Sequence, residues 1–214
     1  MRRNVMVRTR ADPYGDVVTS RLALRIMDGE VMTACVTGAL GRAGTRLGVP
    51  VPRDVLERPT SFQFGLAQLR TDPEYLPWSA RAVILRAENT MVGHVRFHSR
   101  PDPEYLRPYA RDAVELGYTI FERYRRRGYA TEAVIGLMDW AGAFFNVRRF
   151  VASIAPENLP SLRLVAGLGF TKVGEQVDDI DGLEHVFLCE IPSDPTLTSS
   201  SASVRPPYGS ADHR

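Results

Sequence analysis

The residues best suited to chemistry lie in RYRRRGYATEA, residues 123–133, where four arginines within five positions are followed by glycine. The first amides of a helix have no intrahelical acceptor, and the helix dipole favours negative charge beside them. Gly128 would let the backbone approach a bulky ligand, and the flanking arginines can add charge-assisted bonds to phosphate. If a helix begins just after Gly128, the segment predicts a binding turn for a small anion.

Two other interpretations of this segment stay open. Arg-x-x-Gly-x-Ala is a weak pattern by itself, and a charged surface turn before a helix would look the same. A basic cluster also marks nucleic-acid binding. Only Tyr124 and Tyr129 offer interleaved stacking surfaces, and the net charge of the chain is only +2. A dedicated nucleic-acid binder usually carries more positive charge, so we expect no nucleic-acid partner.

Composition indicates an ordinary soluble globular chain of 214 residues, with 44% hydrophobic and 24% charged residues. Cys35 and Cys189 lie far apart, which implies neither a disulfide framework nor a metal site, so we expect no metal and a reduced, cytoplasmic environment. The first residues lack the apolar run of a signal peptide, and no apolar run approaches the ~18 residues of a membrane span. We therefore expect no membrane partner.

The elements that must position the arginine-rich turn follow from periodicity and turn residues. We expect one domain over residues 17–192, between a loose arm over 1–16 and a disordered tail over 193–214. Alternation predicts strands over 21–27, 80–86, 91–98, 113–121, 149–154, 170–177 and 183–191. Helical spacing and caps predict helices from Asp28 towards Leu40, over 53–69 with a break near Pro59, over 130–144, and from Pro160 to Gly169. This order predicts a mixed α/β or α+β domain.

Two stretches together resemble a known family. VELGYTIFERYRRRGYATEAVIGLMDWA, followed by ENLPSLRLVAGLGFTKVGE, is similar to the GNAT superfamily of N-acetyltransferases, in the branch that includes ribosomal-protein N-terminal acetyltransferases. The resemblance is dense from Val92 to Cys189 and weak before it. It implies a GNAT fold, a twisted mixed sheet of about six or seven strands flanked by helices.

The resemblance also implies a cofactor site for acetyl-CoA. The family's signature falls on Arg125, Gly128 and Ala130, and the strand that pairs with the pantetheine arm ends at Thr119, Ile120 and Phe121. The family's Asn-x-x-Ser falls on Asn158, which would contact the cofactor arm, and Ser161, which would lie near the thioester sulfur. The amides that would hold the pyrophosphate are those of Arg126, Arg127, Gly128, Tyr129, Ala130 and Thr131.

Acetylation of an amine requires a group that assists loss of the amine proton and a donor to the leaving sulfur. Glu115 is our candidate for the first, because alternation puts it on one strand face with Gly117 and Thr119. A salt bridge to an arginine across the sheet is an equally good reading of Glu115. Ser161 is our candidate for the second, although a serine in a first helical turn can instead bond the backbone.

Other candidate groups are weaker. Many family members use a tyrosine as acid further along the last helix, and this chain has Leu164, Val165 and Ala166 there. Tyr118 should face away from Glu115 and join the core. His94 and His98 share a strand face but lie about 13 Å apart, too far to bind one metal ion, so we expect partly exposed strand residues.

The resemblance therefore predicts an acetyl-CoA-dependent N-acetyltransferase that moves an acetyl group directly to a primary amine of a small molecule or protein N-terminus. A non-catalytic acyl-CoA-binding module is the first alternative, and a nucleic-acid-associated protein that uses the arginine run is a second. We expect a small-molecule or peptide acceptor, and an edge strand of the final hairpin could pair two subunits as a homodimer.

Overall fold

The computed structural model describes residues 12–178 and 182–192. The tail expected over 193–214, residues 1–11 of the expected arm, and the Asp181 part of the last hairpin turn lie outside these residues. Within the arm, the carbonyls of Pro13 and Gly15 accept hydrogen bonds from the buried guanidinium of Arg81. Trp140 Nε1 also donates to the Pro13 carbonyl, over 3.2 Å. Contacts with the domain thus begin before residue 17.

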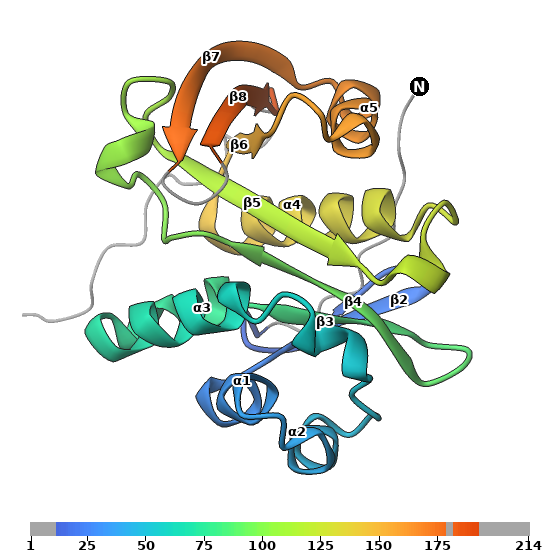
Figure 1. Cartoon of the computed structure of the whole chain (residues 1–214). Helices are drawn as coiled ribbons and strands as arrows, with labels where there is room; N and C mark the ends of the chain where they lie inside the picture. Colours follow the sequence, from blue (N-terminus) through green and yellow to red (C-terminus); the bar gives the residue numbers. More distant parts are fainter. Residues whose placement is uncertain (1–11, 179–181, 193–214) are drawn as a thin grey trace, which may run out of the picture.

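A single mixed sheet organises the described part of the chain (Figure 1). Its strands are β1 (Val17–Val18), β2 (Leu22–Ile26), β3 (Arg81–Leu85), β4 (Thr90–Phe97), β5 (Ala113–Ile120), β6 (Arg149–Ile154), β7 (Thr171–Asp178) and β8 (Gly182–Glu190). They lie in the order β1-β2-β3-β4-β5-β6-β8-β7. All neighbours are antiparallel except β5 and β6, which are parallel. The described sheet has 8 strands, slightly more than predicted, and the mixed α/β fold is confirmed.

Helices cover both faces of this sheet. The α-helices are α1 (Gly29–Val36), α2 (Leu40–Leu47), α3 (Thr60–Thr71), α4 (Tyr129–Phe145) and α5 (Leu159–Leu168). Short 3-10 helices are η1 (Arg53–Leu56), η2 (Pro73–Trp78), η3 (Glu104–Leu106) and η4 (Glu122–Tyr124). Figure 1 shows α1, α2 and α3 on one side of the sheet and α4 on the other.

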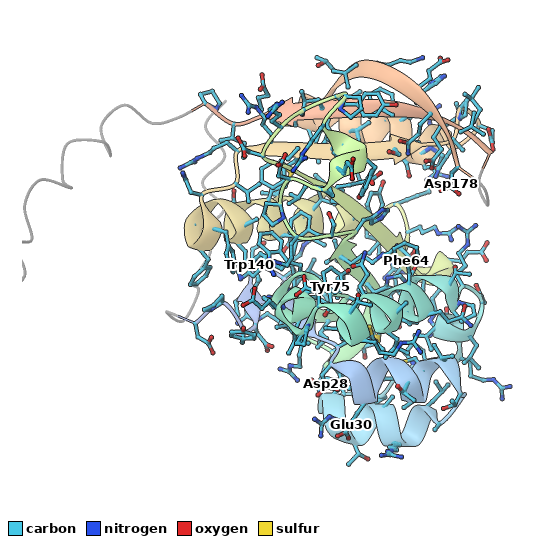
Figure 2. All side chains as sticks on the ribbon, turned by 90° about the vertical axis from the view of Figure 1, so that its left-hand side faces the viewer. Asp28, Glu30, Phe64, Tyr75, Trp140 and Asp178 are labelled. Carbon is cyan, nitrogen blue, oxygen red and sulfur yellow. The ribbon has the colours of Figure 1, made fainter. Side chains whose placement is uncertain are left out.

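Two apolar layers fix these helices to the sheet. On the α4–α5 side, Leu24, Val83 and Phe97 pack with Val134 and Leu137 of α4 in one buried cluster. The fully buried Trp140, labelled in Figure 2, belongs to the same layer. On the other side, a second cluster joins the sheet to α1, α2 and α3 through Ala82, Ile84, Met32, Leu47 and Phe62. Helices therefore cover both faces of the sheet near β5. The polar side chains of β5 need hydrogen-bond partners within these covered faces.

Candidate active site

Strands β5 and β6 diverge where the predicted cofactor strand begins. Their parallel pairing joins Ala113 to Arg149, Val114 to Phe150 and Glu115 to Val151, and the described pairing ends there. Beyond Glu115, β5 continues to Ile120 and pairs with β4 alone. The backbone edge of β5 that faces away from β4 therefore has no strand partner beyond Glu115 among the strands described. At Ile120 its carbonyl accepts from Arg125 Nε, whereas Thr119 turns its own amide and carbonyl towards β4.

The turn between β5 and α4 presents a row of free amides. Arg126 and Gly128 both adopt left-handed conformations, with φ of 61° and 80°. Within the described residues, the amides of residues 126–131 have no hydrogen-bond acceptor, and the first one bonded is that of Glu132, to the Gly128 carbonyl. A non-glycine residue held at positive φ is uncommon and often marks a functional site. Successive free amides at a helix N-terminus are suited to bind an anion.

Side-chain contacts hold this turn in place. Arg125 Nε donates to the Ile120 carbonyl over 2.9 Å, which joins the turn to the end of β5. Arg21, which directly precedes β2, donates through Nη1 to the Arg127 carbonyl over 3.0 Å. The Arg21 guanidinium also lies over the Tyr129 ring, 4.7 Å from its centroid. The shape of the turn is thus set partly by a residue more than a hundred positions earlier.

Glu132 is the second anchor that sequence reasoning missed. Its place in the helical repeat puts it on the face away from the apolar stripe, yet only 10% of its side chain is exposed. Its carboxylate accepts hydrogen bonds from the hydroxyls of Thr19 and Ser20 and from the amide and Nε of Arg21. This carboxylate ties the first turn of α4 to the β1–β2 turn. Helical spacing alone could not identify this contact, because it does not show which strand turn meets the helix.

Asn158 and Ser161 lie together at the start of α5. Asn158 Oδ1 accepts from the Ser161 amide over 3.3 Å, so Asn158 is the N-cap of this helix. The hydroxyl of Tyr118 donates to Ser161 Oγ over 3.0 Å. Burial raises the pKa of Tyr118. The prediction that Tyr118 is a core residue is incomplete, since its ring packs against the core while its hydroxyl meets a predicted site residue.

Glu115 lies on the opposite face of β5 and is buried, with 4% of the residue exposed. Its partner is His98 rather than the arginine that we had considered, with Nδ1 of His98 3.4 Å from Oε2 of Glu115. Burial alone would raise the pKa of the Glu115 carboxyl, but its polar neighbours, led by His98, hold that pKa below its ordinary value. Glu115 is thus a buried carboxylate whose more exposed neighbour is His98.

The expectation that both histidines of β4 are partly exposed was wrong for His94. It is 3% exposed, and its ring lies 4.8 Å from the ring of Phe62 on α3. Burial, aided by the charge of Arg96, lowers the pKa of His94 to about 3. In the described part of the chain, no group of three or more potential ligands could hold a metal ion.

The predicted cofactor residues thus fall into one region. The open edge of β5, the free amides of residues 126–131 and the Asn158–Ser161 helix start surround the divergence of β5 and β6. Thr119, Phe121 and Arg125 also line a small cavity with His94 and Asp54. Arg123 points elsewhere and pairs with Asp54 over 3.2 Å. Among the described residues, no helix is long and apolar enough to cross a membrane.

Solved structures with the same fold include two that are informative. A putative ribosomal-protein-serine acetyltransferase from Vibrio cholerae has a TM-score of 0.56 at 21% identity, covering 84% of this chain and 99% of that one. The microcin C7 self-immunity acetyltransferase MccE, in complex with acetyl-CoA and AMP, has a TM-score of 0.55 at 14% identity, covering 84% and 98%. At these identities the likeness establishes the fold.

Sequence comparison supports a closer relation. An uncharacterized N-acetyltransferase of Bacillus subtilis, YnaD, is 29% identical over 92 residues, 43% of this chain and 49% of that protein. The chain spans about half the length or less of the curated relatives that it matches. The acetyltransferase (GNAT) domain family matches residues 36–171, which include β5, the amide-rich turn, α4 and α5. The chain therefore belongs to the GNAT family of acetyltransferases.

Proposed function

We propose that this chain transfers the acetyl group of acetyl-CoA directly to a primary amine, on a small molecule or a protein N-terminus. One observation carries the proposal: six consecutive amides, those of residues 126–131, lack an acceptor among the described residues, and they follow the open edge of β5. Fully satisfied backbone is the rule in folded proteins, so such a row needs a ligand or water. A diphosphate followed by an extended arm matches both features.

The residues present fit acetyl-CoA. The amides from Arg126 to Thr131 would bind the diphosphate, and the edge of β5 that faces away from β4 around Ile120 would pair with the amide-containing arm. Asn158 uses its Oδ1 for the Ser161 amide, so any contact of Asn158 with the arm would come from Nδ2. Bound acetyl-CoA would supply an acyl group already activated as a thioester.

Ser161 is the proposed donor to the departing sulfur. The Tyr118 hydroxyl donates a hydrogen bond to Ser161 Oγ. The hydroxyl hydrogen of Ser161 is therefore free to point towards another acceptor. A hydroxyl that receives one hydrogen bond is also a better donor of the next, because hydrogen bonds in a chain polarise one another. Tyr118 and Ser161 together would then act as the acid, in place of the tyrosine that α5 lacks at Leu164, Val165 and Ala166.

The acceptor is proposed only as a chemical class. Several structures with the same fold bear names of ribosomal-protein acetyltransferases, so peptides with free N-termini should head a panel that also contains aminoglycosides, polyamines and amino acids. We further propose a cytoplasmic enzyme, and a homodimer formed through β7, which is an exposed edge strand of the sheet. Light scattering after size-exclusion chromatography tests the dimer.

Calorimetric titration of acetyl-CoA is the first test of the proposed function. We expect binding well below ~1 mM, near the upper end of ordinary KM values. Thiol release with the amine panel then tests transfer. A protein that binds acetyl-CoA without release, and that Glu115→Gln leaves unchanged, would be a non-catalytic acyl-CoA-binding module. Steep salt-dependent binding of nucleic acid, lost on Arg→Ala changes and indifferent to CoA, would favour the remaining alternative.

A further inference from the structure

We infer that His98 is the general base that takes the proton of the acceptor amine, and that Glu115 is a positioning residue that holds the His98 ring. This inference rests on the proposed acetyl transfer and assigns one of its steps. The two side chains come from neighbouring strands, and the backbone places them opposite each other. The His98 amide donates to the Glu115 carbonyl over 2.7 Å, and Nδ1 of His98 lies 3.4 Å from Oε2 of Glu115.

Exposure decides which member of the pair can meet an amine. The Glu115 side chain is 5% exposed, whereas that of His98 is 31% exposed. A general base must come within hydrogen-bond reach of the proton that it removes, or reach it through one water molecule. An amine arriving from solvent therefore meets the imidazole first. Glu115 is also the last residue of β5 paired with β6, so His98 stands beside the point where the strands open.

The absence of a side chain at Gly117 leaves room for the His98 imidazole. A Cβ at residue 117 would lie 2.6 Å from Nε2 of His98, closer than side-chain atoms approach one another. The ring therefore lies directly over the backbone of β5 at this position. Any side chain at residue 117 would push the ring away. Nδ1 thus faces Glu115, and Nε2 lies over Gly117, two residues further along β5, where the described pairing of β5 with β6 has ended.

The carboxylate also selects the form of the ring that can act as a base. When Nδ1 carries its hydrogen towards Glu115, the neutral imidazole keeps a lone pair on Nε2. A carboxylate behind the ring also stabilises the imidazolium formed after proton transfer. In the step proposed, Nε2 takes one proton from the ammonium form of the acceptor. The freed nitrogen then forms the C–N bond and loses its second proton to solvent. The C–S bond breaks, the sulfur takes a proton from Ser161, and Ser161 regains a proton from solvent through the Tyr118 hydroxyl.

Other charged groups surround the pair. On β4, the guanidinium of Arg96 lies over the ring of Phe64, which projects from α3 and is labelled in Figure 2. From η3, Tyr105 faces Glu115. The amide of Gln68, also on α3, donates to the His98 carbonyl and carries no charge. Any ionisation seen in the rate must be assigned against Glu115, Arg96 and Tyr105 as well as His98.

The test compares pH–rate profiles of the wild type with those of His98→Gln and Glu115→Gln. We expect His98→Gln to lower kcat about 100-fold or more and to remove the acidic limb of the profile. Glu115→Gln, which can still accept from Nδ1, should keep the limb but move it to lower pH, because the imidazolium loses its counter-charge. A matched control is His185→Gln on β8, where Nε2 lies 3.3 Å from Oε1 of Glu175, and it should leave the profile unchanged.

Two readouts separate a catalytic role from a structural one. Added imidazole should restore part of the rate to His98→Ala, whose cavity lies beside Gly117. The nitrogen NMR shifts of His98 in the wild-type protein should show hydrogen on Nδ1 and none on Nε2 at neutral pH. The NMR measurement does not depend on acetyl transfer, so it tests the position of the His98 hydrogen even if the acetylation assay fails.

Two results would overturn the inference. One is His98→Gln with the wild-type rate and limb while Glu115→Gln loses both, which would make Glu115 the base. The other is a neutral His98 ring with its hydrogen on Nε2. Failure of the proposed function looks different, because then the wild-type protein neither binds acetyl-CoA nor releases thiol with any amine.

Discussion

The hydroxyl of Tyr118 donates to Ser161 Oγ over 3.0 Å, joining β5 to the first turn of α5 on the face of the strand opposite Glu115. Glu115 and Tyr118, three positions apart on β5, thus contact the proposed base and the proposed acid, His98 and Ser161. Glu115 and His98 stand on the α3 side, and Tyr118 and Ser161 stand on the α5 side. In direct transfer the amine nitrogen and the leaving sulfur are two different substituents of one tetrahedral carbon, so separate groups can serve the two proton transfers.

Removing the Tyr118 hydroxyl should slow transfer without weakening cofactor binding. We expect Tyr118→Phe to lower kcat about 10-fold and Ser161→Ala about 100-fold, the lower part of the range for general acids. The double variant should be no slower than Ser161→Ala, because Tyr118 acts through Ser161. Steady-state kinetics with a good acceptor measures this. The control is Tyr109→Phe. It removes a tyrosine hydroxyl that donates to the Glu175 carbonyl over 2.9 Å, and it should not change kcat.

The backbone of the amide-rich turn should matter more than any single arginine. Gly128 has φ of 80°, and a Cβ there would lie 3.3 Å from Nη2 of Arg21. We expect Gly128→Val to abolish acetyl-CoA binding in calorimetry, since a β-branched residue cannot adopt this conformation without strain. Arg123→Ala should change the dissociation constant less than about threefold, as expected for loss of an exposed charge pair.

Gly38→Val is the matched control for Gly128→Val. Gly38 has a similar φ of 76°, and a Cβ there would meet nothing within 4 Å. It therefore carries the same backbone strain outside the binding turn. If both variants lose cofactor binding to the same degree, the effect at Gly128 is one of general stability and the proposed role of the turn is wrong.

Local patterns predicted most elements of the fold because the patterns are strong where the elements are regular. Asp28 accepts from the Val31 amide as the predicted N-cap of α1, and Gly169 ends α5 in the left-handed conformation. Helix α2 was not predicted, since its sequence LGRAGTRL has two glycines in eight residues and an N-cap without a side-chain bond. Its buried residues, Ala43 and Leu47, form the helix by packing rather than by propensity.

The candidate site was less predictable from sequence. Alternation places a side chain on one face of a strand, but it does not tell what covers that face. His94 and His98 share a face, yet Phe62 of α3 covers the His94 ring, whereas 31% of the His98 side chain is exposed. The contact between Tyr118 and Ser161, 43 positions apart, depends on how α5 packs under the sheet. Such relations are tertiary, and a family resemblance conveys them only where its motif includes both partners.

Loss of Glu132 should affect both stability and cofactor binding. We expect Glu132→Ala to lower the free energy of unfolding by about 1–3 kcal/mol, because the buried Thr19 hydroxyl and the donors of Ser20 and Arg21 lose their acceptor. The KM for acetyl-CoA should rise severalfold, since Arg21 loses the carboxylate that orients it beside the amide-rich turn. Urea unfolding and steady-state kinetics measure the two effects. Glu122→Ala, an exposed carboxylate on η4, should change neither.

The buried imidazole of His94 should make the fold sensitive to mild acid. Its folded-state pKa is lowered from 6.5 to about 3, chiefly by burial. Between these values the unfolded chain binds a proton that the folded chain does not, so stability falls as the pH drops below 6.5. One such group contributes a loss of about 1.4 kcal/mol for each pH unit well below its unfolded value. Glu132, with a lowered pKa of its own, adds to the loss at lower pH.

Urea unfolding at pH 7.0 and pH 5.5 tests the His94 contribution, and the comparison with His94→Gln subtracts other groups that titrate in the same window, such as Asp139, whose carboxyl pKa is raised by burial. The wild type should lose about 1 kcal/mol between the two, and His94→Gln should lose much less, whatever its stability at pH 7. His185→Gln, which changes a histidine with a quarter of its side chain exposed (25%), should keep the wild-type difference. A variant His94→Gln with the full wild-type loss would show that another group accounts for the acid sensitivity and that His94 is protonated in the folded protein.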